Sequence, residues 1–287
     1  MTAPLLIVNA DDFGLTPGLS RAILDAGTRG IVSSTSALAN GKALLDATPA
    51  LRDSGLGVGA HLALVGHQGP VLAAREIPTL VDKGGNLAAG WRPFLTRAAA
   101  GSIDPDDVRR EFAAQIDVLE STGLALTHLD THQNLHLWPS IGRITVDLAI
   151  GHRIGAIRVT RSDGWSPIAL GVRFFAARLE RRAREADVRF PAATAGFDEA
   201  GRLDLHHIET ALGRFTSRDV TSAELVCHPS NADDPELASL GWNFRGQDEL
   251  DALTSPDARA VVDRAGFRLG TFADLDDTRP TGRPTHR

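Results

Sequence analysis

Cysteine, lysine and long apolar runs are scarce in this chain of 287 residues. Cys227 is the only cysteine, so no disulfide can form within the chain, and a reducing compartment is the simplest expectation. Lys42 and Lys83 are the only lysines, which argues against Schiff-base chemistry. No apolar run is long enough to span a bilayer, and the N-terminal residues do not resemble a signal peptide. We therefore expect a cytoplasmic protein without a membrane span.

Positive charge is also in deficit. The formal net charge is −6 and the pI is near 5.9. Nucleic-acid grooves and anionic membrane surfaces demand clustered positive charge, so neither is expected as a partner. A run of arginines at 178–184 is interrupted by acidic Glu180, which is typical of a solvated helix face. Because 43% of the residues are hydrophobic, the chain can bury the core of one large domain.

Apolar segments that end in polar residues alternate with amphipathic segments along the chain. Strands are predicted at 5–10, 32–38, 56–64, 124–130, 156–160, 223–228 and 267–272. Helices are predicted at 18–29, 40–54, 105–121, 139–152, 169–186, 205–215 and 249–265. This alternation predicts an α/β fold with mostly parallel strands, and we expect a single-domain irregular (β/α) barrel, similar to a TIM barrel, over residues 1–275. In such barrels the carboxyl ends of the strands carry the chemistry.

Two segments interrupt this pattern. Residues 65–104 form a long insertion that contains Trp91 and Phe94, and a lid, a dimer arm or a structural flap would each account for it. Residues 276–287 are rich in threonine, proline and arginine, which predicts a disordered tail.

Two adjacent carboxylates, Asp11 and Asp12, follow the first apolar segment and stand shortly before Gly14. Ionised carboxylates at the edge of a core repel each other and lose hydration unless a cation or hydrogen-bond donors compensate. Such a pair is typical of a metal site or of acid–base chemistry. The alternative, an acidic N-cap for the helix that begins near Pro17, accounts for one aspartate but hardly for both.

Histidines gather in the segment 127–136. His128, His132 and His136 recur at a spacing of four, which on a helix would align them for metal binding. The preceding apolar residues and the following Pro139 instead predict a strand end and a loop. On an extended backbone His128, Asp130 and His132 share one side, which suits one metal ligand with its supporting carboxylate.

Two further histidines end or interrupt other predicted strands. His61 follows Gly59 in an otherwise apolar strand, and it is either a metal ligand or a satisfied core residue. His228 ends a late strand and is followed by Pro229, so it is a candidate general acid. Because the ends of parallel strands meet in space, we expect these residues to share one site.

An aspartate with two histidines offers oxygen and nitrogen ligands without sulfur. This set suits zinc, magnesium, manganese or another divalent ion, and the sequence does not choose among them. Three protein ligands leave positions open for water and a substrate oxygen, as in a catalytic site. We therefore expect one divalent metal ion as cofactor, with a spare aspartate beside it to accept a proton.

Four motifs together resemble the family of YdjC-type carbohydrate deacetylases. They are Asn9-Ala10-Asp11-Asp12-Phe13-Gly14, Gly59-Ala60-His61, Thr127-His128-Leu129-Asp130-Thr131-His132 and Cys227-His228-Pro229. The motifs occur in order and span most of the chain. Gln133 and Asn134 stand where relatives active on chitooligosaccharides often have more histidine, and Ser230 stands where many members have glycine, which leaves the substrate open.

The resemblance implies an irregular (β/α) barrel and assigns roles to individual residues. It implies a divalent metal held by Asp12, His61 and His132, with Asp11 as base and His228 as acid. It also suggests Arg158 as a pocket residue that orients Asp11 or a sugar hydroxyl, although an arginine paired at a strand end is an equal alternative. Further candidates for the pocket or for support of the ligands are His128, Asp130 and His136.

The implied activity is hydrolysis of the acetamide of an N-acetylated amino sugar to a free amine and acetate. The sugar would be a free oligosaccharide, a glycoside or part of a natural product, and a homodimer is also implied. Two other functions remain: a metal hydrolase of another bond, such as a phosphoester, and a sugar-binding barrel without turnover. Phosphate sites usually recruit basic clusters, which these motifs lack, and pure binding needs neither Asp11 nor His228. Stacking on a sugar or aglycone, or burial in the core, would account for Trp91, Trp138, Trp165 and Trp242.

Overall fold

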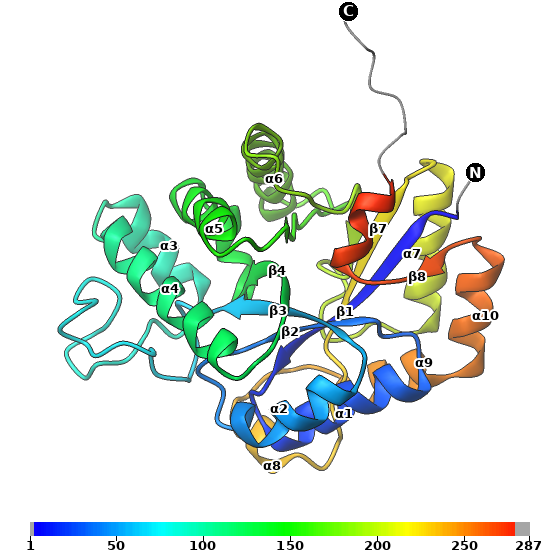
Figure 1. The fold of residues 1–287 in the computed structure, drawn as a ribbon, viewed down its shortest axis with the longest axis horizontal. Helices are drawn as coiled ribbons and strands as arrows, with labels where there is room; N and C mark the ends of the chain where they lie inside the picture. Colours follow the sequence, from blue (N-terminus) through cyan, green and yellow to red (C-terminus); the bar gives the residue numbers. More distant parts are fainter. Residues whose placement is uncertain (1–2, 279–287) are drawn as a thin grey trace, which may run out of the picture.

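The computed structural model describes residues 3–278, and their strands and helices follow the predicted alternation (Figure 1). The strands are β1 (Leu5–Phe13), β2 (Ser34–Ala37), β3 (Gly57–Leu62), β4 (Leu126–Thr131), β5 (Ala156–Ile157), β6 (Ala193–Ala195), β7 (Ser222–Cys227) and β8 (Arg268–Leu269). The α-helices are α1 (Pro17–Arg29), α2 (Leu44–Asp53), α3 (Trp91–Ala99), α4 (Pro105–Ser121), α5 (Pro139–Gly151), α6 (Pro167–Glu185), α7 (Leu205–Ser217), α8 (Pro235–Ser239), α9 (Gly246–Thr254) and α10 (Pro256–Arg264). The 3-10 helices are η1 (His132–Leu137) and η2 (Phe272–Thr278).

The named strands form one parallel sheet that curls into an irregular barrel. Its order is β5-β4-β3-β2-β1-β7-β6, and β8 pairs with the start of β1. Every residue of β1 is buried, which explains why this central strand reads as a continuous apolar run until it reaches its polar end. The helices lie around the outside of the strands (Figure 1). The predicted fold class, a single-domain (β/α) barrel with parallel strands, is confirmed.

The barrel is least regular where its two edges meet. β5 has two residues and β6 has three. The edges are joined by separate hydrogen bonds: Ile157 N donates to Arg189 O at 2.9 Å, and the Thr194 hydroxyl donates to Val159 O at 2.8 Å. Because β6 is so short, the apolar-run rule does not detect it, and it is absent from the predicted strands.

The long insertion packs against α4. Ile77 and Phe94 of the insertion are buried, and the carboxylate of Glu111 in α4 accepts hydrogen bonds from Val71 N at 2.8 Å and Leu72 N at 3.0 Å. The insertion also contains α3, a helix that was not predicted. It is therefore anchored to the barrel by buried side chains and by a buried carboxylate.

The segment predicted as one helix at 249–265 is two helices, α9 and α10. Ser255 has extended backbone angles, with φ −68° and ψ 145°, and its hydroxyl accepts a hydrogen bond from Ala258 N at 3.1 Å. Pro256 then begins α10, where its missing N–H costs nothing. The prediction of a single helix was wrong, because the extended Ser255 ends α9 and caps α10.

The C-terminal part of the chain is described as far as residue 278. η2 includes positions 276–278 of the segment expected to be a disordered tail, and residues 279–287 lie outside the described residues. Within residues 3–278, none of the helices combines the length and apolarity that crossing a membrane requires.

Gly59 of β3 allows an imidazole from β4 to lie directly against the backbone. A Cβ atom at Gly59 would lie 2.3 Å from His128 Cε1. We expect Gly59→Ala to lower the free energy of unfolding by about 1–3 kcal/mol, because the ring must shift within a packed core. Gly213→Ala in α7 is the control, since a Cβ there meets nothing in the described part of the chain within 4 Å. Urea unfolding measures both, and equal stabilities would contradict the close approach at Gly59.

Candidate metal centre and active site

The end of β1 brings two neighbouring aspartates to one pocket. In a regular strand Asp11 and Asp12 would point to opposite faces. Here the pairing of β1 with β2 shifts register between Ala10 and Phe13, and Asp12 has a left-handed backbone with φ 69°. Bulges of this kind redirect side chains, and both carboxylates line the pocket. The N-cap of α1 is Thr16, so the helix-cap alternative for the aspartates is wrong.

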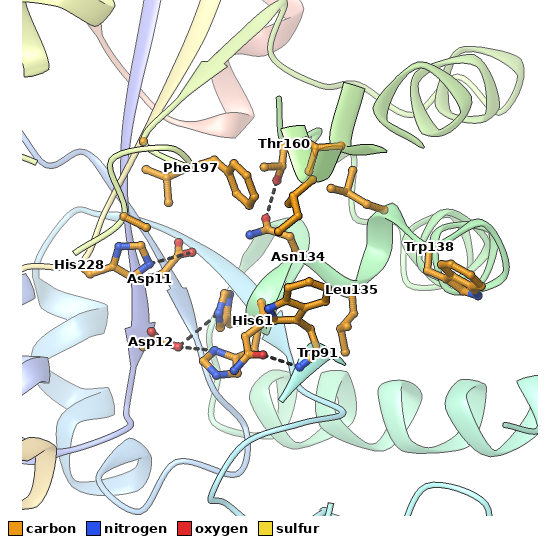
Figure 2. Close-up of a pocket in the computed structure, with 18 of the residues that line it drawn as sticks. Asp11, Asp12, His61, Trp91, Asn134, Leu135, Trp138, Thr160, Phe197 and His228 are labelled. Carbon is orange, nitrogen blue, oxygen red and sulfur yellow. Dashed lines mark hydrogen bonds and ion pairs between the residues drawn. The ribbon is translucent and has the colours of Figure 1, made fainter. Parts of the chain in front are cut away.

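The candidate ligand atoms of Asp12, His61 of β3 and His132 of η1 lie within 4.8 Å of one another. Figure 2 shows Asp12 and His61 facing each other. Asp12 Oδ1 lies 3.3 Å from His61 Nε2 and 2.9 Å from His132 Nδ1. All three residues are buried. Burial alone would raise the pKa of Asp12, but the charges of the two imidazoles hold this pKa well below its usual range. Potential metal-ligand atoms from three distant stretches of the chain therefore lie close together.

His61 is oriented from behind by Asp130 of β4. His61 Nδ1 lies 2.7 Å from Asp130 Oδ1, while Nε2 faces Asp12. A ligating imidazole usually gives its other N–H to a carboxylate, and this arrangement has that form. Burial works to lower the pKa of His61, but the negative charges of Asp130 and Asp11 hold it well above its usual value. A metal ion would displace that proton, because imidazole ligates in its neutral form.

The chain turns immediately after His132. Gln133 and Asn134 both have left-handed backbones, with φ 55° and 56°. Gln133 Oε1 accepts a hydrogen bond from Trp91 N at 2.7 Å, and Asn134 Oδ1 accepts one from the Thr160 hydroxyl at 2.5 Å. These bonds tie the turn to the insertion and to the segment after β5, so His132 is held on a braced loop.

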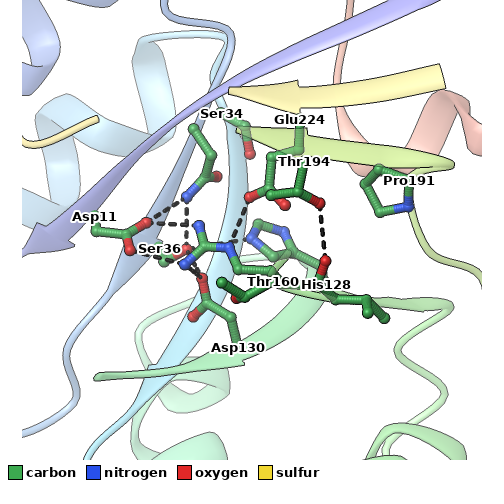
Figure 3. Close-up of polar contacts among 12 residues, drawn as sticks. Asp11, Ser34, Ser36, His128, Asp130, Thr160, Pro191, Thr194 and Glu224 are labelled. Atoms are coloured by element: carbon green, nitrogen blue, oxygen red, sulfur yellow. Dashed lines mark hydrogen bonds and ion pairs between the residues drawn. The ribbon is translucent and has the colours of Figure 1, made fainter. Parts of the chain in front are cut away.

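Arg158 joins the acidic groups around the centre. Its guanidinium donates to both oxygens of Asp11, each at 2.7 Å, which is the two-point geometry that fixes a carboxylate's orientation. It also forms ion pairs with Asp130 Oδ2 and Glu224 Oε1, each at 2.7 Å. Figure 3 shows the carboxylates of Asp11, Asp130 and Glu224 directed toward one place. Arg158 is not among the residues that line the pocket. It is an arginine paired at a strand end, and one of its partners is Asp11.

His228 faces Asp11 at the end of β7. Its Nε2 lies 4.0 Å from Asp11 Oδ2, and the backbone N–H of His228 donates to Glu249 Oε2 at 2.6 Å. The ring packs edge-on against Phe244, with 5.1 Å between ring centroids. Figure 2 shows His228 and Asp11 together, next to Asp12. A carboxylate and an imidazole thus face each other beside the three candidate ligands.

His128 and His136 do not line the pocket. His128 stacks on Phe272 at 3.7 Å between centroids, and its Nε2 lies 3.2 Å from Ser36 Oγ, which in turn donates to Asp130 Oδ2 at 2.7 Å. His136 Nδ1 lies 2.7 Å from Thr131 Oγ1. Burial lowers the pKa of each histidine to about 3, so both imidazoles are neutral. His128 supports Asp130 from behind, and His136 braces η1.

The centre contains more buried aspartates than arginines. Asp11, Asp12 and Asp130 are buried, and Arg158 is the basic residue that contacts the first and third of them. Burial works to raise the pKa of Asp130, but Arg158 and His61 hold it well below its usual range. Asp12 Oδ1 accepts no well-formed hydrogen bond from the described residues despite its two imidazole neighbours. A buried carboxylate oxygen with open lone pairs beside two imidazoles fits a divalent cation.

Glu224 is a buried acid that the sequence prediction missed. It lies in the middle of β7, where an ionisable residue interrupts an apolar strand, just as His61 does in β3. Burial raises the pKa of Glu224 to about 7, against the opposing effect of Arg158. The rule that singled out His61 would therefore also have identified Glu224.

This raised pKa predicts a pH dependence of stability. Between about pH 4.5 and 7 the unfolded chain releases a proton that folded Glu224 keeps, so the wild type loses stability as pH rises. We expect the stability of the wild type relative to Glu224→Gln to fall by on the order of 3 kcal/mol across this window, at 1.36 kcal/mol per pKa unit. Urea unfolding at several pH values measures the difference. A constant difference would show that folding does not raise the pKa of Glu224.

The centre opens into a cavity of about 560 Å³, within the roughly 300–1,000 Å³ typical of small-molecule sites. Asp11, Asp12, His61, His132 and His228 form one end of it. Three of the four tryptophans line the cavity, namely Trp91, Trp138 and Trp242. Trp165 does not line it and is 87% exposed.

Fold and site together define a parallel (β/α) barrel protein with a buried aspartate and histidine cluster that is compatible with a single metal ion. The family model described as "YdjC-like protein" matches residues 5–264. The chain therefore belongs to the YdjC-like family, as the four motifs suggest.

Two relatives and a solved structure agree with this membership. The chain is 32% identical over 277 residues to a chitooligosaccharide deacetylase of Serratia marcescens, which covers 94% of this chain and 99% of that protein. It is 31% identical over 298 residues to a human carbohydrate deacetylase, at 96% and 92% coverage. A crystal structure from Enterococcus faecalis V583, described provisionally as a cellobiose-phosphate cleavage protein, superposes with a TM-score of 0.80 at 25% identity, covering 96% of this chain and 99% of that one. The fold is therefore shared over the whole domain.

Proposed function

We propose that this protein is a metal-dependent carbohydrate deacetylase that hydrolyses the acetamide of an N-acetylated amino sugar to a free amine and acetate. The observation that carries the proposal is the buried centre, where Asp12, His61 and His132 present ligand atoms beside the Asp11–His228 pair. The names of the two relatives, both deacetylases of carbohydrates, support the same activity.

Asp12, His61 and His132 would hold the metal. A divalent ion at such a site supplies a Lewis acid that polarises the amide carbonyl and offsets the negative charge that develops on its oxygen. Asp130 keeps His61 in the ligating orientation, and the buried setting strengthens every charge interaction with the substrate. The identity of the ion is left open by an oxygen and nitrogen ligand set.

Asp11 and His228 would move the protons. Arg158 and Asn9 each hydrogen-bond to Asp11, yet Asp11 Oδ2 accepts a single hydrogen bond and keeps a lone pair for the water that attacks the carbonyl carbon. As the new C–O bond forms, the proton of this water passes to Asp11. His228 Nε2 then donates a proton to the nitrogen as the C–N bond breaks, so the sugar leaves as an amine.

The two competing functions receive less support. The described lining of the cavity contains neither arginine nor lysine, whereas phosphoester sites usually recruit both to bind the phosphate oxygens. A sugar-binding barrel without turnover would need neither a carboxylate held in a fixed orientation nor the histidine that faces it.

Acetate release tests the proposal. The purified protein is incubated with a panel of N-acetylated sugars and glycosides, with a chelator, and with individual divalent ions added back after chelation. We expect acetate from at least one member, abolished by the chelator and restored by metal. Absence of acetate from every substrate with every ion, or release that the chelator leaves unchanged, would contradict it.

A further inference from the structure

Glu249 of α9 is a buried carboxylate that contacts the backbone of the proposed acid, His228. It is fully buried, and each of its oxygens accepts a hydrogen bond from a backbone N–H group. Oε1 accepts from Leu203 N at 3.0 Å and Oε2 accepts from His228 N at 2.6 Å. Burial raises the pKa of Glu249, against the opposing effects of the His228 charge and of these hydrogen bonds.

The partners of Glu249 set it apart from the other buried carboxylates near the site. Asp11, Asp130 and Glu224 each form an ion pair with Arg158 at 2.7 Å. Glu249 instead binds backbone N–H groups, which fix the course of the chain and leave the carboxylate close to the imidazole of His228. Burying a carboxylate is costly unless donors compensate, so both hydrogen bonds are needed to keep it there.

The two backbone groups belong to different strand ends. Leu203 lies in the segment between β6 and α7, and the same segment lines the cavity with Gly196, Phe197 and Ala200. His228 follows directly after β7. One carboxylate in α9 therefore ties a wall of the cavity to the residue that faces Asp11.

The residues just before α9 hold the ring of His228 from another side. Phe244 packs edge-on against this ring, and Arg245 N donates to Gly201 O at 2.6 Å. A Cβ atom at Gly201 would lie 2.2 Å from Phe244 Cδ1, so the phenyl ring rests directly on that backbone. The position of His228 thus depends on α9 and on the residues that lead into it.

The imidazole of His228 has no side-chain partner that orients it from behind. Its Nδ1 is buried and accepts or donates no hydrogen bond within residues 3–278, while Nε2 faces Asp11 Oδ2 at 4.0 Å. In many catalytic sites a carboxylate at Nδ1 fixes the histidine. Here the carboxylate that contacts this residue does so at the backbone N–H.

Building on the proposed function, we infer that Glu249 is a positioning residue for proton transfer by His228. By accepting the N–H of His228, it fixes the end of β7 so that Nε2 reaches the nitrogen that leaves. Glu249 does not line the cavity, so it acts through His228 and not on the substrate.

Glu249→Gln tests this role, because glutamine has one carbonyl oxygen and cannot accept from both N–H groups. A general acid contributes about 10²–10⁴-fold, so we expect kcat for the acetamide to fall at least about tenfold. Hydrolysis of 4-nitrophenyl acetate, whose leaving group departs without a proton, should stay within about twofold. If the variant does not fold, Glu249→Asp gives the same comparison, since its shorter side chain cannot span both groups. An equal loss for amide and ester would overturn the inference.

Glu111→Gln is the matched control. Glu111 is also fully buried and also accepts two backbone hydrogen bonds, from Val71 N and Leu72 N, but it lies outside the cavity lining. This variant should keep the wild-type ratio of amide to ester hydrolysis. A ratio that falls as far as in Glu249→Gln would show that loss of any such buried contact suffices.

A double-mutant cycle tests whether Glu249 acts through His228. His228→Ala should lower amide hydrolysis and spare the ester. In that background Glu249→Gln should change kcat by no more than about twofold, because residues that act as a unit are not additive. Losses that multiply in the double variant would overturn the inference.

A measurement without turnover separates this inference from the proposed activity. If no substrate releases acetate, the deacetylase proposal fails, and the ¹⁵N signals of the His228 ring in the metal-free protein still decide the inference. The signals are assigned by their loss in His228→Ala. They should shift in Glu249→Gln and stay in place in Glu111→Gln. Unchanged His228 signals in folded Glu249→Gln would overturn the inference.

Discussion

Asp11→Asn should lower kcat for amide hydrolysis by about 10²–10⁴-fold, the usual contribution of a general base. The asparagine side chain keeps the shape of Asp11 and a carbonyl oxygen for Arg158, but it cannot accept a proton from water. Metal content should stay at the wild-type level, because Asp11 is not one of the three proposed metal ligands, Asp12, His61 and His132. Steady-state kinetics and elemental analysis on the same preparation measure both quantities.

A matched control for this substitution is Asp147→Asn. Like Asp11, Asp147 accepts two hydrogen bonds from arginine, here from Arg109 at 3.2 Å and Arg182 at 2.8 Å, but it lies outside the cavity lining. The Asp147→Asn variant should retain full activity. Full activity of Asp11→Asn itself would remove Asp11 from the proton-transfer role.

Arg158→Met should lower the free energy of unfolding by about 3–5 kcal/mol, since breaking a buried ion pair leaves a charge without compensation. Arg158 is buried, and its loss leaves Asp11 and Asp130 without their shared cation. The methionine fills much of the same volume, so packing changes little. Urea unfolding of the metal-free protein gives the value.

Arg109→Met is the control for this loss, because Arg109 is 43% exposed and pairs with Asp147 at the surface. Exposed pairs contribute about 0–1 kcal/mol, so this variant should unfold within about 1 kcal/mol of the wild type. If Arg158→Met were no less stable than Arg109→Met, the buried acidic cluster would not depend on Arg158.

Sequence reasoning predicted the fold and the strand ends that carry the site, because both follow from local patterns. Apolar runs alternate with helical segments, and in a parallel barrel the ends of such runs meet on one face. That is why Asp12, His61 and His132, which are far apart in the chain, could be expected together.

The bulge in β1 could not be predicted in this way. A period of two places Asp11 and Asp12 on opposite faces, and only the register shift with a left-handed Asp12 brings both to the pocket. The sequence also did not show which histidine Asp130 orients. Asp130 contacts His61 on the neighbouring strand rather than a histidine of its own segment. Register between strands is a tertiary property.

The apolar wall of α6 was missed for a different reason. The arginines near the end of that helix indicate a solvated face, whereas Ile168, Val172 and Phe175 in its first half line the cavity. A helix can line a cavity with its first half and face solvent with its second, and composition averaged over the helix does not separate the two.

Metal stoichiometry tests the central claim most directly, namely that Asp12, His61 and His132 hold one divalent ion. The protein is stripped with chelator and titrated calorimetrically with zinc, manganese or magnesium, beside His132→Ala, His61→Ala and a surface control, His206→Ala. We expect one equivalent for the wild type and the control, with binding at least about 100-fold weaker in the two site variants, since loss of a supporting group alone costs 10–100-fold. One equivalent bound with unchanged affinity after loss of either His61 or His132 would contradict the account.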